Sequence, residues 1–396
     1  MPLATQQLLV SDDATKPPTG SRAVSGAGRI RQDDAVTAQE IARLRRANQR
    51  IARADATSAV DVASTLGALQ GQDTLGSLWA IGLRMHETTE GCIQEEVARG
   101  ALVRTWPMRG TLHLTAAIDV PWMLALLAPR AIGQAAGRAR ALGLDDAAFA
   151  RARTLVSGAL AGGRACSRQG LYDLFDAGGV SSDGQRGQHI VRRLAQEGLI
   201  CQGPRDGKQP ALMLLADRVP NGVAKSREEA LAELARRYFT SHGPATVQDF
   251  MWWSGLTSAD AKSGLASAAG LDETKVGPTS YWMAPEAHEG TMLPSVDLLP
   301  AFDEYLLGYH DRGAVLDPEH AQHVCPGSNG MFMPMIAVNG RIEGIWKRTL
   351  RARSVVVSPS PFRRLVASEK RLLSDAADRY GRFLGLTAIV DWVPAR

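Results

Sequence analysis

Two glutamines separated by one residue are the groups in this sequence best suited to do chemistry. Gln70, Gly71 and Gln72 follow an apolar segment that predicts a helix over residues 58–69, and Gly71 stands where a C-cap glycine would. A carboxamide can hold and polarise a water molecule without titrating. Such a pair suits hydrolysis of a bond whose leaving group already carries positive charge. On residue type alone, the two side chains could equally cap a helix end.

A second polar set lies on a predicted β-hairpin formed by residues 102–106 and 109–115. Alternation along the second strand sends Arg109, Thr111 and His113 to one face and leucines to the other. Since only one face can join a hydrophobic core, the polar face is either exposed to water or lines a cavity. No metal site is expected, because no matching ligand set accompanies the histidine.

A run of helices followed by this hairpin is predicted to hold these residues in place. Thr37 and Glu40 have the spacing of a capping box and mark where folded structure should begin. Apolar residues at helical spacing then predict helices over residues 58–69, 74–86 and 93–99. Helices followed by a β-hairpin form the pattern of a winged-helix unit.

The same order of elements recurs twice before the chain changes character. The second copy has predicted helices at 167–175 and 187–197, and the third begins at residue 228. The C-terminal part has an Asn-Gly turn between two strand patterns, at residues 339–340, the strongest short-range hairpin signal. We therefore expect an α+β fold with three tandem winged-helix units and a C-terminal, mostly β, barrel-like domain. The expected divisions are a disordered tail at 1–35, and then 36–150, 151–222, 223–290 and 291–396.

A winged helix usually binds duplex DNA with one helix in the major groove and its wing over the backbone. Polar residues of the second unit have that arrangement, and a solvated helix face with a polar turn is the alternative. The candidate contacts on the helix and the wing tip are Arg186, His189, Arg192, Arg193, Arg205 and Lys208. In the first hairpin we add Arg104 to the polar residues of the second strand.

Asp303 and Glu304 are the most conspicuous acidic pair in the sequence. They could position a water molecule or a basic neighbour in a site. A salt bridge at a domain boundary is the ordinary alternative.

Composition narrows the classes of function. The 396-residue chain has a net charge of +4, which is compatible with a nucleic-acid partner. It lacks a long apolar run, a secretory signal and a C-x-x-C motif, so we expect a cytoplasmic protein away from membranes. No Walker loop, Rossmann fingerprint, H-E-x-x-H or G-x-S-x-G is present, so we expect no cofactor and none of the corresponding activities.

Six segments, taken in order, resemble the AlkZ/YcaQ superfamily of winged-helix DNA glycosylases. The resemblance covers about residue 37 to the C-terminus and implies tandem winged helices curved around duplex DNA. The family's catalytic signature, glutamine–aliphatic–glutamine, falls on Gln70 and Gln72, and Gly71 departs from it. A related branch has aspartate at the second polar position, so Gln72 favours the AlkZ-like branch. The segments are residues 69–73, 104–114, 187–203, 237–249, 298–312 and 344–346.

What the resemblance implies is a monofunctional DNA glycosylase that removes bulky N7-alkylguanine adducts, with interstrand crosslinks a further candidate substrate. The setting would be base-excision repair, or self-resistance to a DNA-alkylating natural product. The expected partner is double-stranded DNA carrying alkylated purines, bound by a monomer. The alternative is a non-catalytic DNA-binding protein, a regulator or lesion-sequestering factor, which Gly71 and the absence of a tuned acid or base would suit.

Overall fold

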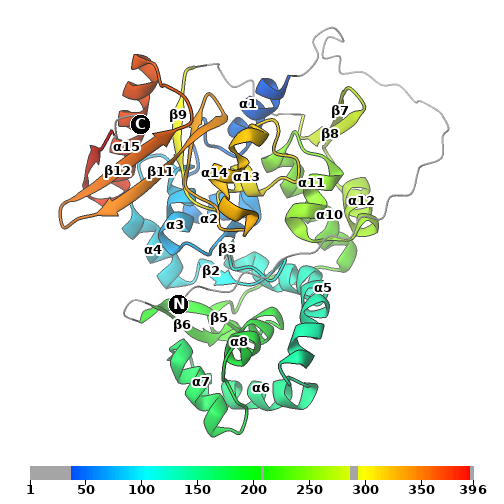
Figure 1. The fold of residues 1–396 in the computed structure, drawn as a ribbon. Coiled ribbons are helices and arrows are strands. Elements are labelled where there is room, and N and C mark those ends of the chain that lie inside the picture. The colour runs from blue at the N-terminus through cyan, green and yellow to red at the C-terminus, as the bar shows by residue number, and fades with distance from the viewer. Residues whose placement is uncertain (1–36, 207–208, 286–292, 393–396) are drawn as a thin grey trace, which may run out of the picture.

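The computed structural model describes residues 37–206, 209–285 and 293–392, so the expected tail at 1–35 lies outside it. The described chain mixes helices and sheets, which confirms the α+β class. In Figure 1 the C-terminal sheet and the N-terminal helices form the upper part of the molecule. A lower lobe contains helices α6 (Asp146–Leu160), α7 (Arg168–Ala177) and α8 (Arg186–Gln196) with strands β5 (Ile200–Asp206) and β6 (Gln209–Leu214). Helix α5 (Val120–Ala141) connects the two parts.

The N-terminal helices are α1 (Ala38–Asn48), α2 (Ala59–Leu66), α3 (Thr74–Gly82) and α4 (Glu90–Arg99). The side chain of Thr37 accepts a hydrogen bond from the Glu40 N–H and begins α1, as the sequence predicts. The prediction that the glutamines end a helix is wrong. Helix α2 stops at Gly67, whose φ of 79° breaks the helical path, and Gln70 lies in a short strand, β1 (Leu69–Gln70).

The two predicted hairpins share one sheet, with strand order β1-β3-β2-β5-β6-β4. Arg104 in β2 pairs with Gln202 in β5, which couples the two parts of the chain. The bounds of the strands are β2 (Leu102–Thr105), β3 (His113–Ala116), β4 (Ala165–Cys166), β5 (Ile200–Asp206) and β6 (Gln209–Leu214). Only His113 of the predicted polar strand face is in a strand, because β3 begins there, and Arg109 has a left-handed φ of 52°.

The sequence did not predict the long helix α5 (Val120–Ala141) or its successor α6 (Asp146–Leu160). Alanine and glycine are frequent in both helices, so their apolar periodicity is weak. The lower lobe continues with α7 (Arg168–Ala177), α8 (Arg186–Gln196) and α9 (Leu215–Arg218). Because α5 contributes side chains to three hydrophobic clusters, it ties this lobe to the rest of the protein.

The third segment, predicted to begin at residue 228, contains helices followed by a hairpin. Capping boxes at Ser226–Glu229 and Thr246–Asp249 begin two of them. The elements are α10 (Arg227–His242), α11 (Val247–Ser254), α12 (Ser258–Ser267), β7 (Asp272–Val276) and β8 (Thr279–Met283), and the two strands form a separate hairpin.

The C-terminal sheet has the order β13-β12-β11-β10-β9. The hairpin predicted at Asn339-Gly340 is confirmed, since Val338 pairs with Arg341. Helix α15 (Ala367–Leu384) leads to β13, which pairs in parallel with β12. The strands are β9 (Val296–Leu299), β10 (Met335–Val338), β11 (Arg341–Leu350), β12 (Ser354–Pro361) and β13 (Thr387–Val390), with short helices α13 (Glu304–Leu307) and α14 (Ala321–Val324).

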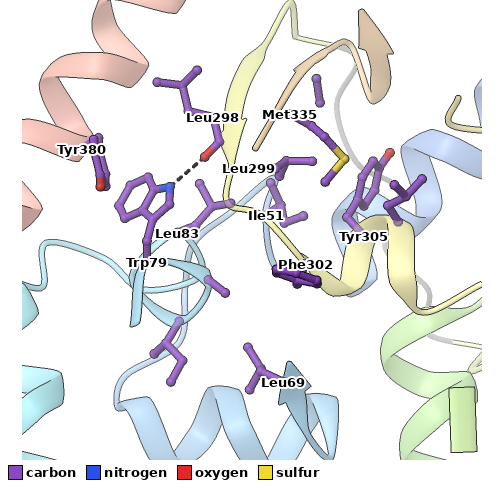
Figure 2. Close-up of a cluster of buried hydrophobic side chains, with 14 of the residues drawn as sticks. Ile51, Leu69, Trp79, Leu83, Leu298, Leu299, Phe302, Tyr305, Met335 and Tyr380 are labelled. Atoms are coloured by element: carbon purple, nitrogen blue, oxygen red, sulfur yellow. Dashed lines mark hydrogen bonds between the residues drawn. The ribbon is translucent and has the colours of Figure 1, made fainter. Parts of the chain in front are cut away.

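One hydrophobic cluster joins the N-terminal helices to the C-terminal sheet. Trp79 of α3 lies in it, packed edge-on against Tyr380 with ring centroids 5.0 Å apart. Its indole N–H donates to the Leu298 carbonyl oxygen at 2.7 Å, as Figure 2 shows. Leu69, next to Gln70, belongs to the same cluster. The strand that carries the first glutamine is therefore anchored in a core built from both ends of the described chain.

Candidate functional site

Gln70 and Gln72 are separated by a single residue but lie in different environments. Gln70 is buried, 6% exposed, and pairs with His113 of β3. Its Oε1 atom is buried and accepts no hydrogen bond from any residue that the structure describes. Gln72, two residues on, is exposed. The pair therefore offers one buried amide and one that solvent can reach.

The backbone between the glutamines is held by three separate partners. Glu304 Oε1 accepts a hydrogen bond from the Gln70 N–H at 3.1 Å. The Gly71 N–H donates to the Leu112 carbonyl oxygen at 2.7 Å, and Arg104 donates to the Gly71 carbonyl oxygen. Arg104 also donates to Thr74 Oγ1 at 2.9 Å. These contacts fix the segment although glycine itself imposes no conformation.

Glycine at position 71 matches the close approach of Arg104. A Cβ atom at residue 71 would lie 3.2 Å from Arg104 Nε and 3.2 Å from the Leu112 carbonyl oxygen. In this chain, an arginine side chain thus occupies the space beside residue 71 where an aliphatic side chain would extend. The sequence predicts that Arg104 contacts DNA. In the structure it donates a hydrogen bond to the glutamine segment.

We predict that Gly71→Val lowers activity because the new side chain displaces the Arg104 guanidinium. Arg104→Ala should also lower activity, by releasing the Gly71 carbonyl. The double variant Gly71→Val/Arg104→Ala should lose less than the two single losses added together, since each change then makes room for the other. Reaction rates measured for the four proteins give this coupling. Strictly additive losses would show that residues 71 and 104 act independently.

His113 is fully buried on the sheet face that it shares with Gln70 and Thr105, its partners on the two neighbouring strands. Its Nδ1–H donates to the Thr111 carbonyl oxygen at 2.9 Å, and its Nε2 is buried without a partner among the described residues. Burial, reinforced by the positive charge of Arg109, lowers the pKa of His113 to about 3. The imidazole is therefore neutral at physiological pH and presents an acceptor nitrogen.

The buried His113 should make stability depend on acid pH. The pKa of His113 is about 3 in the folded protein and 6.5 in an unperturbed imidazole. As the pH falls, the unfolded chain therefore binds a proton at this residue before the folded protein does. The free energy of unfolding should therefore drop between pH 6.5 and 3, with about 2 kcal/mol of the loss between pH 7 and 5 due to this group. Urea unfolding of His113→Gln should show a correspondingly smaller drop. His86→Gln, which removes an exposed imidazole, should behave as wild type.

Arg109 lies at the same end of the site, and its guanidinium is largely desolvated. Its Nε and Nη2 atoms are buried and have no hydrogen-bond partner among the residues described. Burial lowers the pKa of Arg109, while the carboxylate of Glu304 acts in the opposite direction. The Thr111 hydroxyl lies 3.4 Å from the carbonyl oxygen of Met108, three residues earlier in the chain. Arg109 is thus a cation near the site that has no carboxylate within ion-pair distance among the described residues, although the charge of Glu304 acts on it.

Glu304 is a buried carboxylate that contacts both the glutamine strand and the neighbouring helices. It is 1% exposed, and Oε2 accepts a hydrogen bond from the Trp253 indole N–H at 2.9 Å. Trp253 also packs under the turn that precedes β1, where a Cβ at Gly67 would lie 3.2 Å from its ring. His242 Nε2 is 3.7 Å from Glu304 Oε2. Glu304 therefore connects the glutamine strand to the helices α10 and α11.

Asp303 is committed to a buried ion pair. Arg84 donates to both carboxylate oxygens, at 2.8 and 3.0 Å, and both side chains are 0% exposed. The backbone N–H of Tyr305 donates to the same carboxylate at 2.9 Å and begins α13. The sequence left two interpretations of Asp303: a group that positions a water molecule or a basic neighbour, and a salt bridge. The structure contains a salt bridge, which joins segments distant in the sequence.

Of the predicted contacts on α8, His189 is buried and Arg186, Arg192 and Arg193 are half-buried. His189 is 7% exposed, and burial lowers its pKa to about 4, with the charges of Arg192 and Arg138 in support. Arg192 Nη2 lies 3.0 Å from His189 Nδ1, and Arg186 donates to the Leu142 carbonyl oxygen. Arg193 pairs with Glu197 along α8.

Helix α8 also faces the turn of the first hairpin. A Cβ at Gly110 would lie 3.9 Å from Arg192 Nη1, so this arginine borders the loop that carries Arg109. The remaining two predicted contacts give less information. Arg205 lies in β5, where only its backbone is described, and Lys208 lies outside the described residues.

The sequence reasoning missed the contact between the glutamine segment and the C-terminal sheet. Arg348 of β11 donates to both oxygens of Asp73, at 3.0 and 2.9 Å. Asp73 directly follows Gln72, so β11 contacts the residue next to the exposed glutamine. No local pattern marks Asp73, Arg84, Trp253 or Arg348, because each partner is distant in the sequence.

Two negative findings concern the described residues only. No three of their His, Cys, Asp or Glu side chains are grouped so that they could bind a metal ion. None of the helices in the described ranges combines the length and the apolar character that a membrane span needs.

Comparison with known proteins gives a consistent result. The family model described as "DNA glycosylase AlkZ-like" matches residues 63–383. The chain is 29% identical over 321 residues to an "Interstrand DNA cross-link repair glycosylase" of Streptomyces sahachiroi, covering 77% of this chain and 85% of that one. The solved structure of Streptomyces sahachiroi DNA glycosylase AlkZ superimposes with a TM-score of 0.74 at 23% identity, covering 89% of this chain and 99% of that one. The chain belongs to the AlkZ-like family of DNA glycosylases.

Proposed function

We propose that this glycosylase hydrolyses the N-glycosidic bond of N7-alkylated guanine in double-stranded DNA. The observation that carries the proposal is the pair formed by a buried Gln70 with an unpartnered Oε1 and an exposed Gln72. Both stand on a backbone segment that Glu304 and Arg104 hold in place. An alkylated N7 makes the purine cationic, so its departure needs little help from an acid. The absence of a protonated histidine at the site is therefore no obstacle.

The two amides suit the remaining demands of the reaction. As the base departs, the sugar acquires oxocarbenium character, and a water molecule must be aimed at its C1′ atom. Amide oxygens of Gln70 and Gln72 can accept hydrogen bonds from that water, while the NH2 groups bind acceptors on the sugar or phosphate. Groups that are already oriented lose no energy to reorganisation during the reaction. The dense backbone contacts of this segment support such preorganisation.

A bulky lesion requires an open site, and the C-terminal sheet supplies a candidate surface. Beyond Arg348, the hairpin of β11 and β12 continues past Leu350, which is 53% exposed, to the exposed Arg351 and Arg353. We propose that this hairpin contacts the DNA beside Gln72. The name of the Streptomyces relative adds interstrand crosslinks as a second substrate to test.

The tertiary arrangement that we propose for the enzyme follows the sequence divisions. Residues 36–150, 151–222 and 223–290 would form three winged-helix units and residues 291–396 the C-terminal domain, acting as a monomer on duplex DNA. The recurrence of helices followed by hairpins supports this division. A self-resistance role would follow if the organism makes the agent that forms the lesion.

The test is release of the damaged base. Duplexes that carry a single N7-methylguanine, a bulky N7-alkylguanine or an N7-linked interstrand crosslink are incubated with the protein, and alkali then reveals abasic sites. We expect strand cleavage at the adduct positions and none in undamaged DNA. Tight binding with no base release from any of these duplexes would contradict the proposal and favour a non-catalytic, lesion-sequestering protein.

A further inference from the structure

Two neighbouring tryptophans on α11 differ in exposure. Trp253 is buried and donates its indole N–H to Glu304 below the glutamine strand. Trp252 is 36% exposed, which is unusual for so large an aromatic side chain. His310 packs edge-on against Trp252, with ring centroids 5.7 Å apart. An exposed indole thus stands on the same short helix that supports the site.

Arg312 lies between this indole and a second aromatic ring. Its Cζ atom is 5.7 Å from the ring centroid of Trp252 and 5.1 Å from that of Phe332. Its Nε donates to the Leu306 carbonyl oxygen at 3.2 Å. Among the described residues no carboxylate lies within ion-pair distance of it, although the negative charge of Asp249 acts on it. The guanidinium is therefore oriented by rings and a carbonyl, and its charge is left to attract an anion.

A second arginine, Arg109, adds to the positive charge that acts on Arg312. Burial lowers the pKa of Arg312, and the positive charge of Arg109 contributes to the same shift. Neither arginine is paired with a carboxylate in the part of the chain that the structure describes. Two partly desolvated like charges cost free energy in the folded protein, and an anion bound by both would remove that cost. The arrangement therefore favours a phosphate, which two guanidinium groups bind strongly.

These residues border the glutamine site. Arg109 Cγ is 3.2 Å from the point where a Cβ at Gly255 would lie, and Gly255 is the C-cap of α11. Arg109 also interacts with the charge of Glu304, whose Oε1 binds the backbone of Gln70. The exposed ring and the two cations therefore form a surface that continues from the candidate catalytic segment.

We propose that Trp252, Arg312 and Arg109 form a nucleotide subsite in which the arginines bind a backbone phosphate and the indole stacks on an unpaired base. The subsite rests on the proposed function, since its occupant is a nucleotide of the DNA at the lesion. Stacking suits this role because every base offers a flat face, whatever the sequence. The subsite would stabilise DNA whose base pairing is opened beside the glutamines.

The test compares a fully paired duplex with the same duplex carrying one unpaired adenine. Fluorescence anisotropy should show that the wild-type protein prefers the duplex with the unpaired base. Trp252→Ala should weaken binding to that duplex by roughly tenfold and binding to the paired duplex much less. Arg312→Ala should weaken both and reduce the slope of log Kd against log salt by about one.

Trp392→Ala is the matched control, because that tryptophan is also exposed, at 38%, and also contacts a cation, Lys370. It should bind both duplexes as wild type does. Equal effects of Trp252→Ala on both duplexes, or no effect on either, would overturn the subsite, provided that thermal unfolding shows the variant to be folded. Base release by the wild-type protein from N7-methylguanine DNA is measured in parallel. Absent release together with an intact Trp252 effect would refute the proposed reaction and leave the subsite standing.

Discussion

Gln72→Ala should slow release of N7-alkylguanine by about 10²- to 10³-fold, the usual cost of removing one preorganised polar group from an active site. Gln72 is exposed, so its loss leaves no buried cavity and no unpaired group in the fold. The affinity for undamaged duplex and the free energy of unfolding should therefore stay close to those of the wild type. Single-turnover rates on a defined adduct duplex, with anisotropy and urea unfolding alongside, separate these three quantities.

Gln70→Ala should slow the reaction as well and, combined with Gln72→Ala, should reduce base release to background. Gln169→Ala provides the control, since it removes an exposed glutamine from α7 in the lower lobe. Full activity in the double variant would refute the assignment of the reaction to these amides. Loss of DNA binding together with activity would instead make the glutamines binding groups.

Asp303→Ala should destabilise the protein by about 3–5 kcal/mol, because it leaves the Arg84 charge buried without its partner. That is a large fraction of the roughly 5–15 kcal/mol that stabilises a typical domain. Loss of the carboxylate also removes the cap of α13, which carries Glu304. Activity measured well below the unfolding transition should therefore fall too, since Glu304 holds the Gln70 backbone.

Urea unfolding checks this prediction against a pair in a different environment. Arg227→Ala breaks a salt bridge with Asp260 in which the arginine side chain is 59% exposed. Its cost should stay below about 1 kcal/mol. A cost of Asp303→Ala in that same range would show that water or another group compensates the Arg84 charge.

Much of the local structure can be read from single residues. The Asn339-Gly340 dipeptide predicts the turn between β10 and β11, since both residues accept the left-handed backbone that such a turn needs. Capping residues such as Thr37 mark helix starts correctly. The prediction of a helix up to Gln70 is wrong, because the apolar segment continues past the helix end into a strand. Apolar periodicity cannot show that change, because both conformations bury the same side chains.

By itself, the sequence determined the α+β class, the glutamine pair and the family to which the chain belongs. Only the tertiary structure decided that Gln70 is buried and Gln72 exposed, that Arg104 takes the space beside Gly71, and that Asp303 is committed to Arg84. The physical reason is the distance along the chain between the residues that determine each feature. Turns and caps depend on neighbours a few residues away, whereas burial, charge pairing and the pKa of His113 depend on segments that meet only after the chain has folded.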